Sequence, residues 1–209
     1  MSDVVLLGDS IFDNASYVPG GPAVIEQVRR GLPPNWKAAL VAVDGHLVAD
    51  VATQLPRVPT GASHLVMSIG GNDALSASGL LRERASTVGA ALAILAHAIG
   101  EFRDAYTAML TRVLALDKPT AVCTIYDAIP IIGDAERAAL AGFNDVISRA
   151  AVNARIPFID LRVICDHADD YSPLSPIEPS VVGGAKIANA ICRLVTTHDF
   201  TKRGCSVYV

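Results

Sequence analysis

Residues 4–14 read Val-Val-Leu-Leu-Gly-Asp-Ser-Ile-Phe-Asp-Asn, and this stretch decides the fold. Its first part, Val4–Leu7, is an apolar run of the length and composition expected for a buried β-strand. The run breaks at Gly8-Asp9-Ser10, which places Ser10 at the carboxyl end of a strand. Open α/β sheets carry their chemistry at that edge. Ser10 is therefore a candidate nucleophile. A plain turn is the alternative, because Gly, Asp and Ser are all turn residues.

Beyond this stretch, short apolar runs alternate with longer segments of helical character. We expect strands at Val4–Leu7, Ala38–Val43, Leu65–Ile69, Thr120–Tyr126 and Pro157–Leu161. We expect helices at Val24–Arg30, Val48–Leu55, Thr87–Leu116 (divided near Gly100), Asp134–Asn153 and Gly184–Thr197. Such alternation is typical of a parallel sheet covered by helices on both faces. The prediction is a single α/β domain over residues 1–209, a three-layer α/β/α sandwich with a parallel sheet of about five strands, flavodoxin-like in arrangement.

Composition and charge exclude several classes of protein. The chain has 209 residues, which fits one domain, and a formal net charge of -4 without any Lys/Arg-rich run. A nucleic-acid binder would show a basic patch, so nucleic acid is not an expected partner. No apolar stretch reaches the length of a membrane span, and the N-terminus lacks a basic segment followed by an apolar signal region. We therefore expect a soluble, cytoplasmic protein.

The residues that commonly bind metals give no recognisable metal pattern. The four cysteines are widely spaced and form no Cys-x-x-Cys pair, so a zinc site is not expected and the thiols should be reduced. Asp166, Asp169 and Asp170 do not follow a calcium-loop pattern. We expect neither a metal nor a cofactor, and the sequence does not indicate an oligomeric state.

Two later stretches change the interpretation of the Gly-Asp-Ser turn. Residues 68–73 read Ser-Ile-Gly-Gly-Asn-Asp directly after an apolar run, and residues 177–188 read Ile-Glu-Pro-Ser-Val-Val-Gly-Gly-Ala-Lys-Ile-Ala. With Gly45 between them and the turn, the order of motifs resembles the SGNH hydrolases, also called the GDSL esterases and lipases. The resemblance runs from about residue 4 to residue 195. It implies the SGNH hydrolase fold and the hydrolysis of esters by a serine.

The resemblance also implies roles for individual residues. Ser10 would be the nucleophile and would open the first helix after the strand. The backbone N–H groups of Ser10 and Gly45 and the side-chain amide of Asn72 would hold the oxyanion, and three preorganised donors around one oxygen stabilise developing charge. A glycine at position 45 lets the substrate approach the backbone, although a simple strand-to-helix turn is the alternative for this residue. We expect Asp9 to hold the turn through backbone hydrogen bonds.

The sequence departs from the family pattern at the catalytic base. The family ends in Asp-x-x-His-Pro, but here Glu178 stands where the His belongs and Ser175 where the Asp belongs. Glu178 could itself be the base if burial raises its pKa from about 4.3 toward neutrality. Alternatively, a His could stand between Ser10 and Glu178, as in other triads. His46 is the first candidate because it follows the oxyanion glycine, and His167 is the second. For His46 the alternative is an exposed residue at the start of a helix.

The predicted function is the hydrolysis of small-molecule carboxylic esters through an acyl-Ser10 intermediate, with no cofactor. A carboxylate is a weaker base than an imidazole, so we expect slower hydrolysis of simple esters than in family members that keep the His. The alternative is a catalytically impaired protein of the same fold that binds an acylated ligand without turnover. Glu178 favours this alternative, whereas the intact Gly-Asp-Ser and Gly-Gly-Asn-Asp stretches oppose it.

Overall fold

The centre of the protein is a parallel β-sheet. The computed structural model describes residues 2–202 and 204–209, and within them the sheet has six strands in the order β2-β1-β3-β4-β5-β6. All neighbouring strands are parallel. The strands are β1 (Ser2–Gly8), β2 (Trp36–Leu40), β3 (His64–Ser68), β4 (Thr120–Cys123), β5 (Phe158–Ile159) and β6 (Val207–Tyr208). The predicted parallel α/β sheet is confirmed, with the short edge strand β6 in addition to the strands expected.

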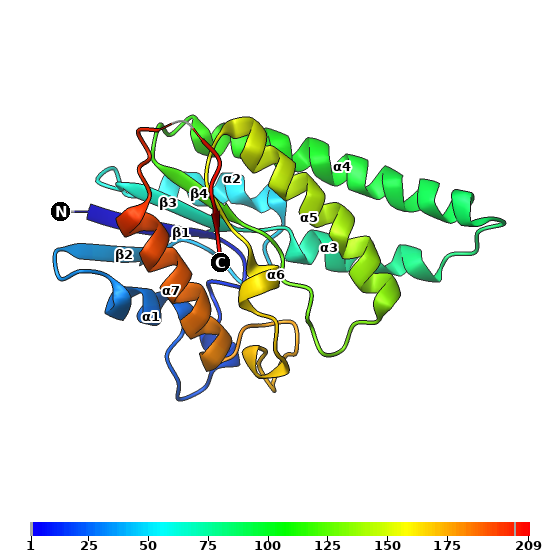
Figure 1. Ribbon diagram of the computed structural model, residues 1–209, viewed down its shortest axis with the longest axis horizontal. Helices are drawn as coiled ribbons and strands as arrows, with labels where there is room; N and C mark the ends of the chain where they lie inside the picture. Colours follow the sequence, from blue (N-terminus) through cyan, green and yellow to red (C-terminus); the bar gives the residue numbers. More distant parts are fainter. Residues whose placement is uncertain (1, 203) are drawn as a thin grey trace.

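Helices cover both faces of this sheet (Figure 1). The α-helices are α1 (Val24–Gly31), α2 (Val51–Gln54), α3 (Gly71–Ala77), α4 (Val88–Leu114), α5 (Asp134–Ala154), α6 (Leu161–Ile164) and α7 (Val181–Thr197). The 3-10 helices are η1 (Ala15–Tyr17), η2 (Val48–Asp50), η3 (Leu55–Arg57), η4 (Ser78–Arg82) and η5 (Ala168–Asp170). Helices α1 and α7 pack on one face of the sheet, and α2, α4 and α5 pack on the other. The arrangement is the predicted three-layer sandwich.

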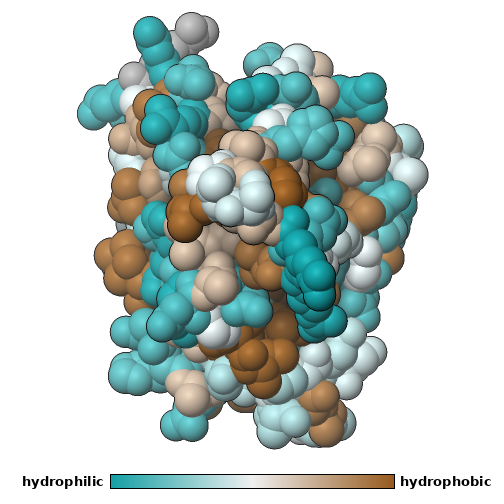
Figure 2. Space-filling view, turned by 90° about the vertical axis from the view of Figure 1, so that its right-hand side faces the viewer, coloured by the Kyte–Doolittle hydropathy of each residue, from teal (hydrophilic) through white to brown (hydrophobic). Residues whose placement is uncertain are grey.

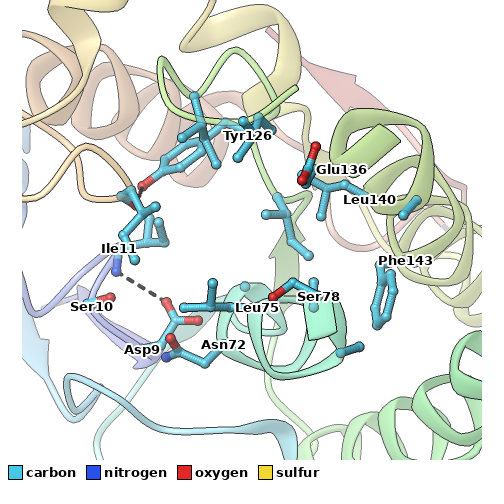
Figure 3. Close-up of a pocket in the computed structure, with 18 of the residues that line it drawn as sticks. Asp9, Ser10, Ile11, Asn72, Leu75, Ser78, Tyr126, Glu136, Leu140 and Phe143 are labelled. Atoms are coloured by element: carbon cyan, nitrogen blue, oxygen red, sulfur yellow. Dashed lines mark hydrogen bonds between the residues drawn. The ribbon is translucent and has the colours of Figure 1, made fainter. Parts of the chain in front are cut away.

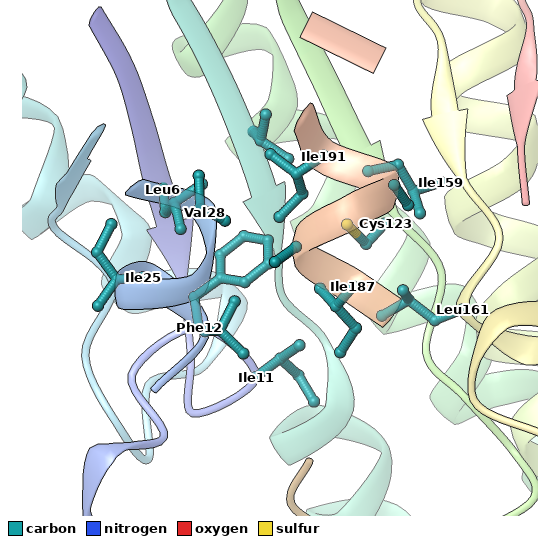
Figure 4. Close-up of a cluster of buried hydrophobic side chains, with 14 of the residues drawn as sticks. Leu6, Ile11, Phe12, Ile25, Val28, Cys123, Ile159, Leu161, Ile187 and Ile191 are labelled. Atoms are coloured by element: carbon teal, nitrogen blue, oxygen red, sulfur yellow. The ribbon is translucent and has the colours of Figure 1, made fainter. Parts of the chain in front are cut away.

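Strand β1 shows why a continuous apolar run fits the middle of this sandwich. Val4 and Leu6 point into the core under α1 and α7, whereas Val5 and Leu7 point into the core under α4 and α5. All four are fully buried, as expected for a parallel strand that is covered on both faces. Figure 4 shows the first of these cores, in which Leu6 lies among side chains of α1 and α7.

Helix α4 is one unbroken helix, so the predicted division near Gly100 is wrong. The Thr87 side chain caps its first turn by accepting a hydrogen bond from the Ala90 N–H. Gly100 lies well inside the helix, where a glycine costs only about 1 kcal/mol relative to alanine. That cost is too small to end a helix of good helix formers. Across residues 2–202 and 204–209, no helix has the length and apolar character needed to cross a membrane.

The end of β1 depends on a glycine. Gly8 has a φ of 125°, and a Cβ on it would lie 1.7 Å from the Ser68 carbonyl oxygen of β3. Beyond it the chain forms a turn, in which the N–H groups of Phe12 and Asp13 both bond to the Asp9 carbonyl. Ser10 therefore lies in this turn and does not open a helix, which corrects the expectation from the resemblance.

Two helical glycines differ in how closely the rest of the protein packs against them, and substituting each by alanine tests this difference. A Cβ on Gly183 in α7 would lie 2.1 Å from the Asp170 carbonyl oxygen, whereas a Cβ on Gly100 in α4 would meet no atom within 4 Å. We expect Gly183→Ala to lower the free energy of unfolding by about 1–3 kcal/mol, because a backbone atom must move. Gly100→Ala should raise it by about 0.5–1 kcal/mol. Urea unfolding followed by circular dichroism measures both, and a Gly183→Ala protein as stable as the wild type would contradict the close packing.

Candidate active site

A cavity of about 130 Å³ opens at the carboxyl end of the sheet. Its polar lining lies beside the ends of β1 and β3, where Asp9, Ser10 and Asn72 meet Glu178. Figure 3 shows Asp9, Ser10 and Asn72 together on one side of the cavity, with Phe143 of α5 on the opposite side. The sheet thus brings together residues that are far apart in the sequence.

Ser10 and Glu178 are in direct contact. The Ser10 hydroxyl donates a hydrogen bond of 2.9 Å to Glu178 Oε1, and the two residues are only 5% and 4% exposed. The second carboxylate oxygen, Oε2, is buried and has no hydrogen-bond partner among the described residues. Oε1 of Glu178 therefore accepts a hydrogen bond from the candidate nucleophile, whereas Oε2 accepts none from the described residues.

The loop between η5 and α7 holds Glu178 in place through its backbone. The Glu178 N–H donates to the Ser175 carbonyl, and the Glu178 carbonyl accepts from the Ser172 N–H. The Tyr126 hydroxyl, from the segment after β4, donates a bond of 2.6 Å to the neighbouring Ile177 carbonyl. These contacts fix the backbone of the loop segment from which the Glu178 side chain reaches Ser10.

Burial changes the basicity of Glu178. Loss of hydration raises the pKa of the Glu178 carboxyl to about 7, and the negative charge of Asp44 acts in the same direction. The hydrogen bond from Ser10 stabilises the carboxylate and opposes this rise in pKa. The shift has the direction required for a carboxylate that acts as a base near neutral pH.

Asp9 supports the turn, and burial disfavours its charged form. Its Oδ1 accepts a bond of 3.2 Å from the Ile11 N–H, in agreement with the structural role expected for it. Burial raises the pKa of Asp9 to about 8, and the charges of Glu178 and Asp73 contribute to the rise, whereas the Ile11 bond lowers it. Burial thus disfavours the charged form of both carboxyl groups beside Ser10, Asp9 and Glu178.

Two of the expected oxyanion residues are linked through a backbone contact. Asn72 Nδ2, in the first turn of α3, donates a bond of 3.0 Å to the His46 carbonyl, next to Gly45. Gly45 has a φ of 79° and lies in a turn closed by the bond from the His46 N–H to the Val43 carbonyl. Within the described residues, the N–H groups of Ser10 and Gly45 donate no hydrogen bond. Ser10 and Asn72 line the cavity, whereas Gly45 is not among its lining residues.

Neither His46 nor His167 bridges Ser10 and Glu178 in the structure. His46 Nδ1 lies 2.9 Å from Gln54 Nε2, and its imidazole bonds to neither Ser10 nor Glu178. His167 is exposed, lies 3.6 Å from the Asp166 carboxylate and does not line the cavity. The direct contact of Ser10 with Glu178 occupies the place that a bridging imidazole would need.

Two buried amide side chains shape the site: Gln54, which sequence reasoning missed, and Asn14, for which we expect the role of a helix cap. Gln54 accepts from the Gly8 N–H at 2.9 Å and donates to the Gly8 carbonyl at 2.7 Å, so it fixes the end of β1. Asn14 accepts from the N–H of Val24 at the start of α1 and donates to the Pro179 carbonyl, next to Glu178. Nothing in the sequence around Gln54 marks it, whereas Asn14 belongs to the opening stretch but acts at long range. Among the described residues, no group of three His, Cys, Asp or Glu side chains is placed to hold a metal ion.

Comparisons with known proteins agree with this architecture. The sequence model of the GDSL-like lipase/acylhydrolase family matches residues 6–183. An extracellular lipase from Streptomyces rimosus shares 20% identity at a TM-score of 0.66, with 95% of this chain and 100% of that chain covered. A lipase/acylhydrolase from Enterococcus faecalis shares 18% identity at 0.65, over 93% and 95% of the two chains. A variant of an acetyl xylan esterase from Geobacillus stearothermophilus shares 15% identity at 0.68, over 95% and 96%. These likenesses show the fold, and the search of curated proteins found no match.

The raised pKa of Glu178 predicts a specific dependence of stability on pH. Because the folded pKa of about 7 lies above the ordinary value of about 4.3, the folded protein binds more protons than the unfolded chain between these values. The contribution of Glu178 to stability is therefore full below about pH 4 and is lost as the pH rises through 7. Glu178→Gln should raise the melting temperature more at pH 8 than at pH 5. Thermal unfolding at both values, with the exposed Glu83→Gln as control, measures this, and an equal change at both pH values would contradict it.

Proposed function

We propose that this chain, which belongs to the GDSL-like lipase/acylhydrolase family, is a serine esterase in which Glu178 acts directly as the base. The observation that carries the proposal is the 2.9 Å hydrogen bond from the Ser10 hydroxyl to the buried Glu178 carboxylate. A nucleophilic serine needs a partner within hydrogen-bond reach that can take its proton. Glu178 meets that geometric requirement, and its raised pKa meets the chemical one.

The acylation step follows from this contact. Ser10 Oγ attacks the ester carbonyl carbon while its proton moves to Glu178 Oε1, which gives a tetrahedral intermediate with a negative oxygen. The carbon–oxygen bond to the alcohol then breaks, and the proton on Glu178 passes to the departing alkoxide oxygen. The products of this half-reaction are the free alcohol, an acyl-Ser10 ester and Glu178 in its charged form.

The negative oxygen of the intermediate needs donors that are already in place. The free N–H groups of Ser10 and Gly45 and the second Asn72 amide N–H are the donors that we assign. The bond from Asn72 to the His46 carbonyl supports this assignment, because it links Asn72 to the turn that carries Gly45. Fixed donors of this kind stabilise the transition state without having to reorganise during the reaction.

Deacylation repeats the same chemistry with water. Glu178 takes a proton from a water molecule, the water oxygen attacks the acyl-Ser10 carbonyl, and the Ser10 oxygen leaves with the proton that Glu178 held. The products are the carboxylic acid and regenerated Ser10.

The first test asks whether Ser10 is activated and by which residue. The wild type should react covalently with a fluorophosphonate probe at Ser10 and hydrolyse p-nitrophenyl esters, and Ser10→Ala should lose both activities. Glu178→Gln should lower kcat/KM at least tenfold because the base is gone. His46→Ala serves as the control and should cost much less, since its imidazole contacts Gln54. A folded wild type that neither labels nor turns over any ester would favour the binding protein without turnover.

The second test concerns the Asn72 amide. Asn72→Ala should lower kcat by roughly 10²–10³ with little change in KM, as is usual when one oxyanion donor is removed. Thermal unfolding must accompany the kinetics, because Asn72 also bonds to the His46 carbonyl. A folded variant whose kcat drops less than threefold would mean that Asn72 does not contact the oxyanion.

A further inference from the structure

The cavity beside Ser10 is polar at one end only. Among its polar groups that are not exposed, Asp9, Ser10, Asn72 and Glu178 lie at the reaction end, and the buried Tyr126 hydroxyl is bonded to the Ile177 carbonyl next to Glu178. The two other polar residues of the lining, Ser78 and Glu136, are exposed. Glu136 is already engaged with its own helix, since its carboxylate accepts the Gly133 N–H that begins α5.

The wall opposite Ser10 is closed by buried hydrocarbon. Ile125, Leu140 and Phe143 line it, and each is at most 8% exposed. Figure 3 shows Leu140 and Phe143 on α5 facing Leu75 on α3 across the cavity. The Phe143 ring packs against Phe102 of α4 at a centroid distance of 4.9 Å, which holds this wall in position. Such a wall offers no hydrogen bond to a sugar or any other polar group.

The rim of the cavity is apolar as well. Leu75 and Leu81 line the cavity and are nevertheless 51% and 37% exposed. Figure 2 looks onto this side of the molecule and shows apolar side chains gathered among polar ones. The apolar lining of the cavity therefore continues to the molecular surface at Leu75 and Leu81.

The size of the cavity sets the length of chain that it holds. Its volume is about 130 Å³. A dry cavity of about 150 Å³ lined by Leu, Ile and Phe holds one benzene molecule, which has six carbons. An acetyl group would leave most of this space empty, whereas a chain of about four to six carbons would fill it.

We propose that this cavity is the acyl subsite and that it selects an aliphatic acyl chain of about four to six carbons over acetyl. The inference rests on the proposed esterase function and adds the class of acyl group to it. With the carbonyl carbon at Ser10 Oγ, the chain would extend between α3 and α5 toward Phe143. Each buried methylene contributes about 0.8 kcal/mol, which corresponds to about fourfold in kcat/KM.

The test is a chain-length series. We expect kcat/KM for p-nitrophenyl esters, corrected for their rates of alkaline hydrolysis, to rise about fourfold per methylene from acetyl. The rise should stop near hexanoyl, where the cavity is full. A corrected kcat/KM for acetyl that equals or exceeds that for hexanoyl would overturn the proposal.

A pair of alanines on α5 provides a matched control. Ala139 lines the cavity and is 9% exposed, whereas its neighbour Ala138 is exposed. Ala139→Leu should lower kcat/KM for the hexanoyl ester at least tenfold, whereas kcat/KM for the acetyl ester should change by no more than about twofold. The chain length with the highest kcat/KM should become shorter. Ala138→Leu should leave the whole series unchanged. A folded Ala139→Leu enzyme with the wild-type series would overturn the proposal.

A binding measurement separates failure of this inference from failure of the proposed function. Hexanamide, which presents the same chain on an unreactive carbonyl, should raise the melting temperature of the wild type, and acetamide should not. Ala139→Leu should abolish the shift. If no ester is hydrolysed but this pattern appears, the cavity is a chain-binding site and the esterase function fails. If hexanamide gives no larger shift than acetamide, the acyl subsite is overturned whatever the activity.

Discussion

The site depends on the close contact between the ends of β1 and β3. Gly8 lies so near the Ser68 carbonyl that any side chain would collide with it, and the Asp9 N–H bonds to that same carbonyl. Gln54 then holds both polar groups of the Gly8 backbone. These constraints fix where the chain turns, and the turn places Ser10 in the lining of the cavity. The candidate nucleophile is therefore positioned by contacts of the Gly8 and Asp9 backbone that involve neither Glu178 nor Asn72.

The exchange of a histidine for Glu178 is chemically consistent in this environment. An imidazole base in a triad needs a carboxylate behind it, whereas Glu178 contacts Ser10 itself and has Ser175 behind it only through a backbone bond. Burial raises the pKa of Glu178 to about 7, which brings its basicity closer to that of an imidazole than an ordinary carboxylate would be. The slow hydrolysis of simple esters stays a prediction, and the kinetics of p-nitrophenyl esters will test it.

The sequence was informative where local patterns carry the signal. The apolar run Val4–Leu7 predicted the central strand, and the match of residue 178 to the family's last motif predicted that Glu178 would lie near Ser10. Strand β6 was not predicted because it is only two residues long and pairs only with β5, at the edge of the sheet. The role of Gln54 was not predicted because it comes from hydrogen bonds to Gly8, which lies 46 residues earlier in the sequence. The pKa of Glu178 depends on burial by the whole fold, which no local pattern encodes.

The apolar surroundings of the site link its chemistry to its specificity. Two carboxyl groups that share a buried space cannot both be charged at low cost, and burial raises the pKa of both Asp9 and Glu178. The cavity that holds these carboxyl groups has a hydrocarbon wall opposite Ser10, and that wall would accept an acyl chain. A lining with more polar groups, suited to an acetylated sugar, would favour the charged form of Glu178 and bring its pKa back toward the ordinary value. A Glu178 of raised pKa and an apolar acyl subsite are therefore mutually consistent features, because both follow from a cavity whose buried polar groups lie only at the reaction end, where the water for deacylation must also enter.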